Sequence, residues 1–313
     1  MGLSGERERA EGTVSEPQDW TERQLIVVTG KGGVGKSALS CVLGRTLAEQ
    51  GRRVLLLEVD RRENLQQMLG VPPSAGEMLP VSEGLHLQNL KPNQVVDWVV
   101  EKKVKIRPIV QRVLSSAVYH RFVEGAPGLN ELAILGHALR VVRGEVPGPT
   151  IDTVILDAPA TGHGVSLLTA PRLVAEAIGH GPFAELAREV ADFVADGRRV
   201  GMVVVTLAEE MPVSEALELR KRLEGEVGRA PDLLVVNGLY PEYDSRTQAS
   251  DDLADLWRRR HRVNADELDR LSSSWQGPRV DLPLLPIDAG EPLVAELTGR
   301  FRERIDDLAG GAS

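Results

Sequence analysis

The chain has 313 residues, enough for two small domains or one large α/β domain. Hydrophobic residues make up 42% of it and charged residues 27%, which is typical of a folded globular protein and excludes a disordered or collagen-like chain. Asp and Glu outnumber Lys and Arg by 46 to 37, and the net charge of −9 disfavours nucleic acid as a partner. The single cysteine, Cys41, excludes an intrachain disulfide and a multi-thiolate metal site within one chain.

The first 23 residues are charged and contain no apolar segment, so they predict a disordered tail and not a secretory signal. No apolar run in the chain approaches the ~18 residues that a membrane-spanning helix needs. Together with the lone cysteine, these features favour a cytoplasmic location.

From residue 24 onward, short runs rich in β-branched residues alternate with helical patterns. Buried parallel strands have this composition because helices cover both of their faces. The sequence therefore predicts an α/β fold with a doubly wound, mostly parallel sheet. The predicted strands are residues 25–28, 54–57, 153–156, 202–206 and 233–236, with a weaker one near Leu284.

A glycine-rich loop follows the first predicted strand and precedes a helical pattern at residues 37–50. Residues 30–37 read Gly-Lys-Gly-Gly-Val-Gly-Lys-Ser and fit the phosphate-loop pattern G-x-x-x-x-G-K-[ST]. Its glycines let backbone N–H groups face an anion at the helix N-terminus, so a polyphosphate is the expected ligand, with Lys36 placed to hold its β and γ phosphates and Ser37 placed to ligate Mg²⁺. The predicted nucleotide-binding residues here are Gly30, Lys31, Gly32, Gly33, Val34, Gly35, Lys36, Ser37 and Ala38.

Nearly a hundred residues separate the second and third predicted strands, more than one crossover helix requires. Apolar residues at helical spacing within 109–118 and 129–139 predict a helical insertion at about 91–147. Further helical insertions are predicted at about 165–200 and, in a polar stretch, at about 245–275, all within one P-loop ATPase domain of residues 24–313. The chain holds one glycine loop, so a function with two nucleotide sites requires a dimer.

Lys31 is not required by an ordinary phosphate loop. Its presence makes the loop resemble the deviant Walker loop of the family that contains MinD, ParA, the nitrogenase iron protein and ArsA. The resemblance implies that Lys31 reaches across a dimer interface and acts like an arginine finger, placing positive charge where the transition state gathers negative charge. The alternative is a solvated loop lysine.

Two further segments resemble the ArsA branch of that family. Residues 156–164, Leu-Asp-Ala-Pro-Ala-Thr-Gly-His-Gly, resemble its switch II, D-T-A-P-T-G-H-T, which implies that Asp157 binds Mg²⁺ through water and reports the γ-phosphate. Asp60 follows the second strand as the switch I aspartate does, which implies that it orients the attacking water. The Pro and His of the branch's D-P-A-H are missing after Asp60, so the coupling of switch I is left open. Helix capping is the alternative for both aspartates.

Four further matches concern the nucleotide and the helices. Asn237 resembles the branch's adenine-reading asparagine, although Asn-Gly also ends strands at turns. Glu209 matches a segment that contacts nucleotide across the dimer, and Pro286 lies in a segment that resembles the loop beside the adenine. Residues 127–129, Pro-Gly-Leu, resemble the loop that links nucleotide state to the helical insertion.

The resemblance implies a Mg-ATP hydrolase that opens and closes as a homodimer or as a heterodimer with a paralogue. Its implied catalytic residues are Lys31, Lys36, Asp60 and Asp157. The apolar helical insertions favour a hydrophobic client or a membrane-associated partner, but their spacing equally fits a plain helical core. The alternative function is a regulatory or transport-coupled switch that binds a protein partner without a client groove. The lone cysteine leaves no place for the zinc or iron–sulfur clamps of related dimers.

Overall fold

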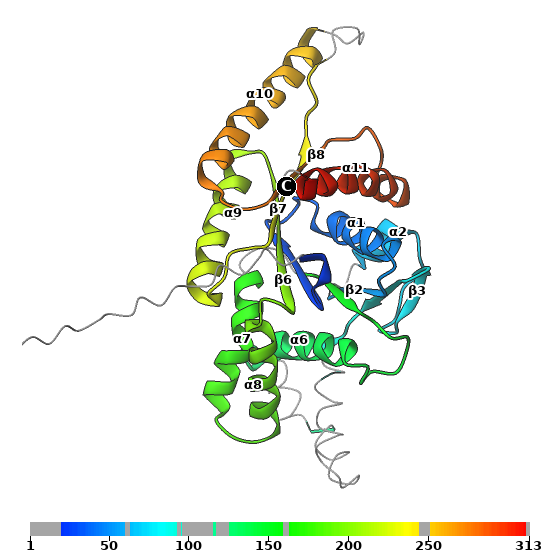
Figure 1. The fold of residues 1–313 in the computed structure, drawn as a ribbon, viewed down its shortest axis with the longest axis vertical. Helices are drawn as coiled ribbons and strands as arrows, with labels where there is room; N and C mark the ends of the chain where they lie inside the picture. Colours follow the sequence, from blue (N-terminus) through cyan, green and yellow to red (C-terminus); the bar gives the residue numbers. More distant parts are fainter. Residues whose placement is uncertain are drawn as a thin grey trace, which may run out of the picture.

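The structure is a computed structural model that describes residues 20–59, 63–92, 95, 115–116, 125–158, 163–243 and 251–310. These residues form an eight-stranded sheet with helices on both faces, so the predicted α/β fold is confirmed (Figure 1). The strand order is β3-β4-β2-β5-β1-β6-β7-β8; only β3 runs antiparallel to its neighbour. The strands are β1 Leu25–Gly30, β2 Val54–Glu58, β3 Leu79–Ser82, β4 Leu85–Asn89, β5 Thr153–Asp157, β6 Val200–Leu207, β7 Leu233–Leu239 and β8 Arg279–Pro283.

The five longer predicted strands each lie inside an observed one. The weaker sixth strand was predicted near Leu284, and β8 ends one residue before this position, at Pro283. The hairpin of β3 and β4 was not predicted, because Pro80 and the alternation of half-buried and exposed residues in β3 hide it from a search for continuous apolar runs. The hairpin lies between β2 and the predicted helical insertion at about 91–147.

Helices connect the strands. Their bounds are α1 Lys36–Glu49, α2 Asn64–Leu69, α6 Leu129–Val142, α7 His163–Ile178, α8 Pro182–Ala195, α9 Glu210–Arg222, α10 Asp251–Ser274 and α11 Glu291–Gly310, with short turns η1 Trp20–Glu22 and η2 Leu223–Val227. Of the predicted helical stretch at residues 109–118, the structure describes residues 115–116, and these two are not helical. Each helix within the described ranges is too short or too polar to cross a lipid bilayer.

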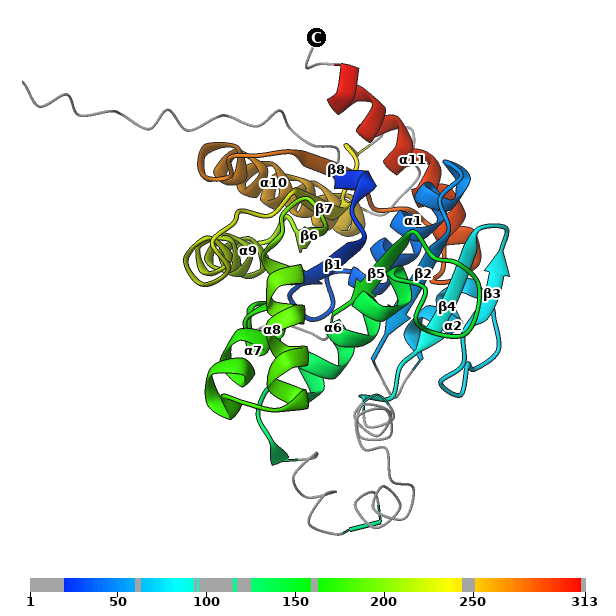
Figure 2. The same cartoon turned by 60° about the horizontal axis from the view of Figure 1, so that its bottom comes forward.

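Two hydrophobic cores lie on opposite faces of the sheet. Ile26 and Val28 of β1 pack with α1, α2 and α11, whereas Leu25 and Val27 pack with α6, α7 and α8. Figure 2 shows these two groups of helices on either side of the strands. Because both faces of β1 are covered, all six of its residues are buried, which explains its continuous apolar sequence. The apolar side chains of α6 belong to the core that contains Leu25 and Val27.

The ordered fold begins earlier than the sequence indicates. The ring of Trp20 lies 6.4 Å from that of Phe301 in an edge-on contact, and Arg23 forms a 3.1 Å ion pair with Asp232. The predicted tail boundary at residue 23 was therefore wrong for residues 20–23. Charged residues predicted a tail here, but in the fold Arg23 pairs with Asp232, directly before β7, and Trp20 contacts α11. The division of residues 24–313 into one domain with three insertions stays a prediction.

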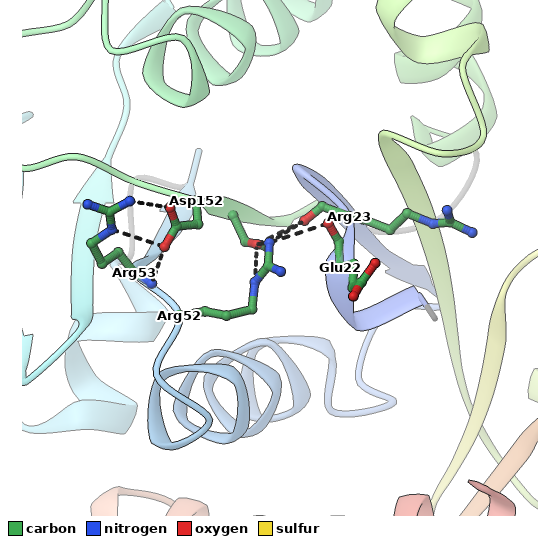
Figure 3. A network of polar contacts seen from close by, with 6 residues as sticks. Glu22, Arg23, Arg52, Arg53 and Asp152 are labelled. Atoms are coloured by element: carbon green, nitrogen blue, oxygen red, sulfur yellow. Dashed lines mark hydrogen bonds and ion pairs between the residues drawn. The ribbon is translucent and has the colours of Figure 1, made fainter. Parts of the chain in front are cut away.

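Arg52 links the residues that precede β1 to the first residue of the neighbouring strand β5 (Figure 3). Its Nε donates to Thr153 Oγ1 at 2.9 Å, and its Nη2 donates to the carbonyl oxygens of Glu22 and Arg23 at 3.3 Å each. The adjacent Arg53 pairs with Asp152 at the surface, as Figure 3 also shows.

Replacing Arg52 with Ala is expected to lower the free energy of unfolding by about 1–3 kcal/mol, because charge-assisted hydrogen bonds at the start of two core strands are lost. Urea unfolding followed by circular dichroism measures this. Arg53→Ala is the matched control and should cost clearly less, since its ion pair is exposed and screened by solvent. Equal losses in the two variants would contradict the role of Arg52.

His137 of α6 is a buried polar link between that helix and the sheet. Its Nε2 lies 2.8 Å from Gln88 Oε1 of β4, and only 6% of the residue is exposed. Burial, together with the nearby charge of Arg140, lowers the pKa of His137 to about 4. A histidine with a depressed folded-state pKa stabilises the fold fully above its unfolded pKa of about 6.5 and loses that contribution as the pH falls toward 4.

Acidification from about pH 7.5 to about pH 5 is therefore expected to lower the free energy of unfolding of the wild type by about 2 kcal/mol more than that of His137→Gln. The reason is that His137 binds a proton in the unfolded chain but stays neutral in the folded one. Urea unfolding at the two pH values gives this difference. His180→Gln, which alters an exposed histidine, should behave as the wild type. If His137→Gln loses as much stability on acidification as the wild type, His137 is not the responsible group.

Candidate nucleotide-binding site

The predicted phosphate loop lies at the carboxyl edge of the sheet. It joins β1 to α1, and β1 lies between β5 and β6. Strands β2 to β5 lie on one side of β1 and strands β6 to β8 on the other, so the strand order changes direction at β1. Ligands of open α/β sheets bind at this topological switch point. The fold therefore puts the loop where a nucleotide is expected.

Two glycines of the loop admit no side chain. A Cβ on Gly30, at a φ of +149°, would lie 2.1 Å from the carbonyl oxygen of Val205 in β6. A Cβ on Gly35, at a φ of +95°, would lie 2.3 Å from Asn237 Nδ2 in β7. The loop backbone thus rests directly on two strands, which only glycine permits.

The N-terminus of α1 is open to an anion. The helix begins at Lys36, and no side chain caps its first turn within the described part of the chain. Uncapped N–H groups and the positive end of the helix dipole favour phosphate at this position.

Ser37 and Asp157 form the oxygen-rich part of the site. The Ser37 hydroxyl donates to Asp157 Oδ2 at 2.6 Å, and the Ser40 hydroxyl donates to Asp157 Oδ1 at 3.1 Å. Asp157 ends β5 and is 8% exposed. A hydroxyl and a carboxylate are hard oxygen donors, so the pair fits Mg²⁺, with Ser37 as ligand and Asp157 acting through water.

The Lys36 side chain is half-buried and folds back onto the loop. Its Nζ donates to the carbonyl oxygen of Lys31 at 3.0 Å. Burial lowers the pKa of Lys36, and the charge of Asp157 opposes this shift. A partly desolvated ammonium attracts phosphate more strongly than an exposed one, because less water screens its charge.

Lys31 is turned toward its own subunit. Its Nζ lies 2.7 Å from Glu215 Oε1 of α9, with the two side chains 27% and 35% exposed. Lys31 is thus paired and not simply solvated. Its action across a dimer interface stays a prediction.

Asp60 lies outside the described residues. On the described side of this segment, β2 ends in Glu58, which is fully buried. Its carboxylate accepts hydrogen bonds from the backbone N–H groups of Asn64 at 2.8 Å and Leu65 at 3.3 Å, and so supports the start of α2. Glu58 was not among the predicted site residues, although it is a charged residue at the end of an otherwise apolar run.

The helix that follows the switch II segment is contacted from two directions. Residues 159–162 lie outside the described residues, and α7 begins at His163. A Cβ on Gly164 would lie 2.3 Å from Thr29 Oγ1 of β1, so α7 starts directly against the strand that carries the phosphate loop. A Cβ on Gly128, in the predicted Pro-Gly-Leu loop, would lie 3.0 Å from Val174 Cγ2 of α7. Movement of α7 would thus reach α6 through this loop.

The residues predicted near the base are brought to this edge in different ways. Asn237 lies within β7, not in a turn after it, and its Nδ2 donates to the carbonyl oxygen of Val34 at 3.0 Å. It therefore supports the phosphate loop, a role that the sequence did not predict. Pro286 is exposed in the segment after β8, which joins the end of β7 through the Leu284 N–H and the Leu239 carbonyl at 2.7 Å. Glu209 precedes α9 and pairs at 3.1 Å with Arg260 of α10.

Comparison with known proteins places the chain in a family. A family model described as anion-transporting ATPase, the ArsA ATPase model, matches residues 23–181. ATPase BagA of Mycobacterium tuberculosis is 28% identical over 225 residues, covering 67% of this chain and 64% of BagA. An arsenical pump-driving ATPase of Escherichia coli is 26% identical over 77% of this chain and 43% of its own length. ATPase get3 of Schizosaccharomyces japonicus is 27% identical over 53% of this chain and 50% of its own. The aligned part of the chain thus spans less than two thirds of each of these relatives.

Proposed function

Because this chain belongs to the ArsA family of anion-transporting ATPases, we propose that it hydrolyses Mg-ATP at the loop between β1 and α1 and opens and closes as a dimer with nucleotide state. The observation that carries the proposal is the 2.6 Å hydrogen bond from Ser37 to Asp157 beneath an uncapped helix N-terminus. This contact joins the hydroxyl expected on Mg²⁺ to the carboxylate expected to sense the γ-phosphate.

In the proposed mechanism the protein positions ATP and stabilises charge. The loop N–H groups and Lys36 bind the phosphates, and Lys31 of the opposite subunit neutralises charge that gathers in the transition state. Ser37, and Asp157 through water, would hold Mg²⁺, which would supply further positive charge to the phosphates when bound. Asp60 orients the water that attacks the γ-phosphate in line with the departing ADP oxygen.

The structure supports a route from the phosphates to the helices. Asp157 lies six residues before α7, and α7 packs against β1 at Gly164 and against Gly128 at the start of α6. A change at Asp157 on γ-phosphate loss would therefore shift α7 against α6 and α8. Packed helices transmit such shifts because they move as rigid units.

We propose a hydrophobic protein segment as the client of this cycle. A cavity of about 660 Å³ lies between α7, α8 and residues 226–227, with Leu168, Ala175 and Val194 among its lining. Leu173 and Ile178 of α7 are 55% and 41% exposed nearby on the same helix. Apolar residues exposed on a switch-linked helix suit a partner that binds in one nucleotide state.

The alternative is a regulatory or transport-coupled switch without a client groove. It is favoured by α6, whose apolar side chains lie in the core and leave no apolar face for a client. Arsenic, which the arsenical pump-driving relatives suggest by name, finds no thiol site here, since Cys41 is the chain's single cysteine and is fully buried. Burial also raises the pKa of the Cys41 thiol.

The first experiment measures oligomeric state by sedimentation without nucleotide, with ADP, and with a non-hydrolysable ATP analogue plus Mg²⁺, and phosphate release with ATP. We expect the protein to dimerise with the analogue plus Mg²⁺ but not with ADP or without nucleotide. We also expect the wild type to release phosphate from ATP well above the rate of Lys36→Ala. An apolar-surface dye then separates the candidates: a gain in the closed dimer supports the client, and no gain supports the switch. Phosphate release no greater than that of Lys36→Ala would overturn the ATPase proposal.

A further inference from the structure

The ion pair between Lys31 and Glu215 is not explained by nucleotide binding. Glu215 lies in the middle of α9, far in sequence from the loop, and its Oε1 is 2.7 Å from Lys31 Nζ. No motif points to Glu215. Glu215 nevertheless pairs with Lys31, the residue that distinguishes this phosphate loop from an ordinary one.

Lys31 is bound at both of its ends. Its ammonium pairs with Glu215, and its carbonyl oxygen accepts the hydrogen bond from Lys36 Nζ at 3.0 Å. Lys36 is also the residue expected to hold the β and γ phosphates, and its ammonium has three donors, so it can bind a phosphate and the Lys31 carbonyl together. Nucleotide bound at Lys36 would therefore lie next to the segment that carries Lys31.

The ion pair with Glu215 opposes the binding of Lys31 to the nucleotide of another subunit. An ammonium 2.7 Å from a carboxylate must give up that pairing before it binds a phosphate oxygen of another subunit. The pair is partly exposed, so its strength is modest and it biases an equilibrium without locking it. A bias of this kind shifts the nucleotide concentration at which the dimer forms.

We propose that Glu215 is a positioning residue that holds Lys31 against its own subunit and thereby sets the ATP concentration at which the dimer closes. This inference rests on the proposed function, because it requires that Lys31 act across the dimer. Loss of the Glu215 charge releases Lys31 in advance of nucleotide, so closure becomes easier. Helix α9 also follows Glu209, so the contact ties the loop to a second segment predicted to face the partner.

The test is a titration of the full chain with a non-hydrolysable ATP analogue and Mg²⁺, with the dimer fraction measured by sedimentation. Glu215→Gln is expected to lower the midpoint by about two- to fivefold at low salt, the range that a partly exposed ion pair allows. The difference from wild type should shrink at about 0.5 M KCl, because salt screens the pair. Glu218→Gln is the matched control: Glu218 is an exposed glutamate on the same helix with no ion pair in the described part of the chain, and its midpoint should stay at the wild-type value.

A Glu215→Gln midpoint equal to or above that of wild type at low salt would overturn the inference, as would a lowered midpoint that Glu218→Gln reproduces. Thermal unfolding of each variant confirms that the fold is intact. Lys31→Ala separates the two levels of the argument. Closure of Lys31→Ala at the wild-type midpoint overturns the cross-dimer function itself, whereas failure of Lys31→Ala to close beside an unchanged Glu215→Gln overturns only the role of Glu215.

Discussion

Replacing Asp157 with Asn is expected to slow ATP hydrolysis by a factor of about 10²–10³, the cost typical of losing one preorganised charged group from a phosphoryl-transfer site. The carboxylate accepts hydrogen bonds from both Ser37 and Ser40, on different oxygens. An amide offers one acceptor and one donor, so one of these hydroxyls must reorient, and the negative charge near the metal is lost. Phosphate release at saturating Mg-ATP measures the effect.

Binding of ATP without Mg²⁺ should survive in Asp157→Asn, because the loop N–H groups and Lys36 are untouched. Ser40→Ala is the matched control, since it removes only the 3.1 Å hydrogen bond and leaves the carboxylate in place. That variant should lose at most about tenfold in rate, the range of one ordinary hydrogen bond. Wild-type turnover in Asp157→Asn would show that this carboxylate is not at the reaction site.

Local sequence was sufficient to predict the sheet and the loop. The apolar run of β1 requires burial on both faces, and Gly30 and Gly35 at the loop ends are dictated by contacts with β6 and β7. These features depend on contacts that any parallel sheet provides, so a short sequence pattern is enough to predict them. The β3–β4 hairpin lacks that property, because an edge strand with one solvated face has no continuous apolar run.

The distances within the site were not predictable from one sequence. Ser37 and Asp157 were both predicted from motifs, but they lie 120 positions apart and their 2.6 Å contact follows only from the pairing of β1 with β5. Glu215 carried no signal at all, since a partly exposed glutamate on a polar helix resembles any solvated residue. Its role depends on the packing of α9 beside the loop.

Replacing Lys31 with Ala is expected to lower ATP turnover by a factor of about 10³ or more, the contribution of a cation supplied to a phosphoryl-transfer transition state from a partner. Binding of ATP to the single subunit should change little, because the Lys31 ammonium pairs with Glu215 of its own subunit. Turnover and equilibrium binding, measured on the same preparation, separate the two effects. Lys31→Arg keeps a positive charge at this position and should retain part of the activity.

Mixing two inactive variants decides whether Lys31 acts across the interface. A Lys31→Ala subunit keeps Asp157, and an Asp157→Asn subunit keeps Lys31. In a mixed dimer, the nucleotide site of the Lys31→Ala subunit therefore receives an intact lysine from its partner, and one complete site forms. Turnover well above that of either variant alone is expected on mixing. Lys31 acting within its own subunit would give no recovery, because each subunit of the mixed dimer would still lack one of the two groups.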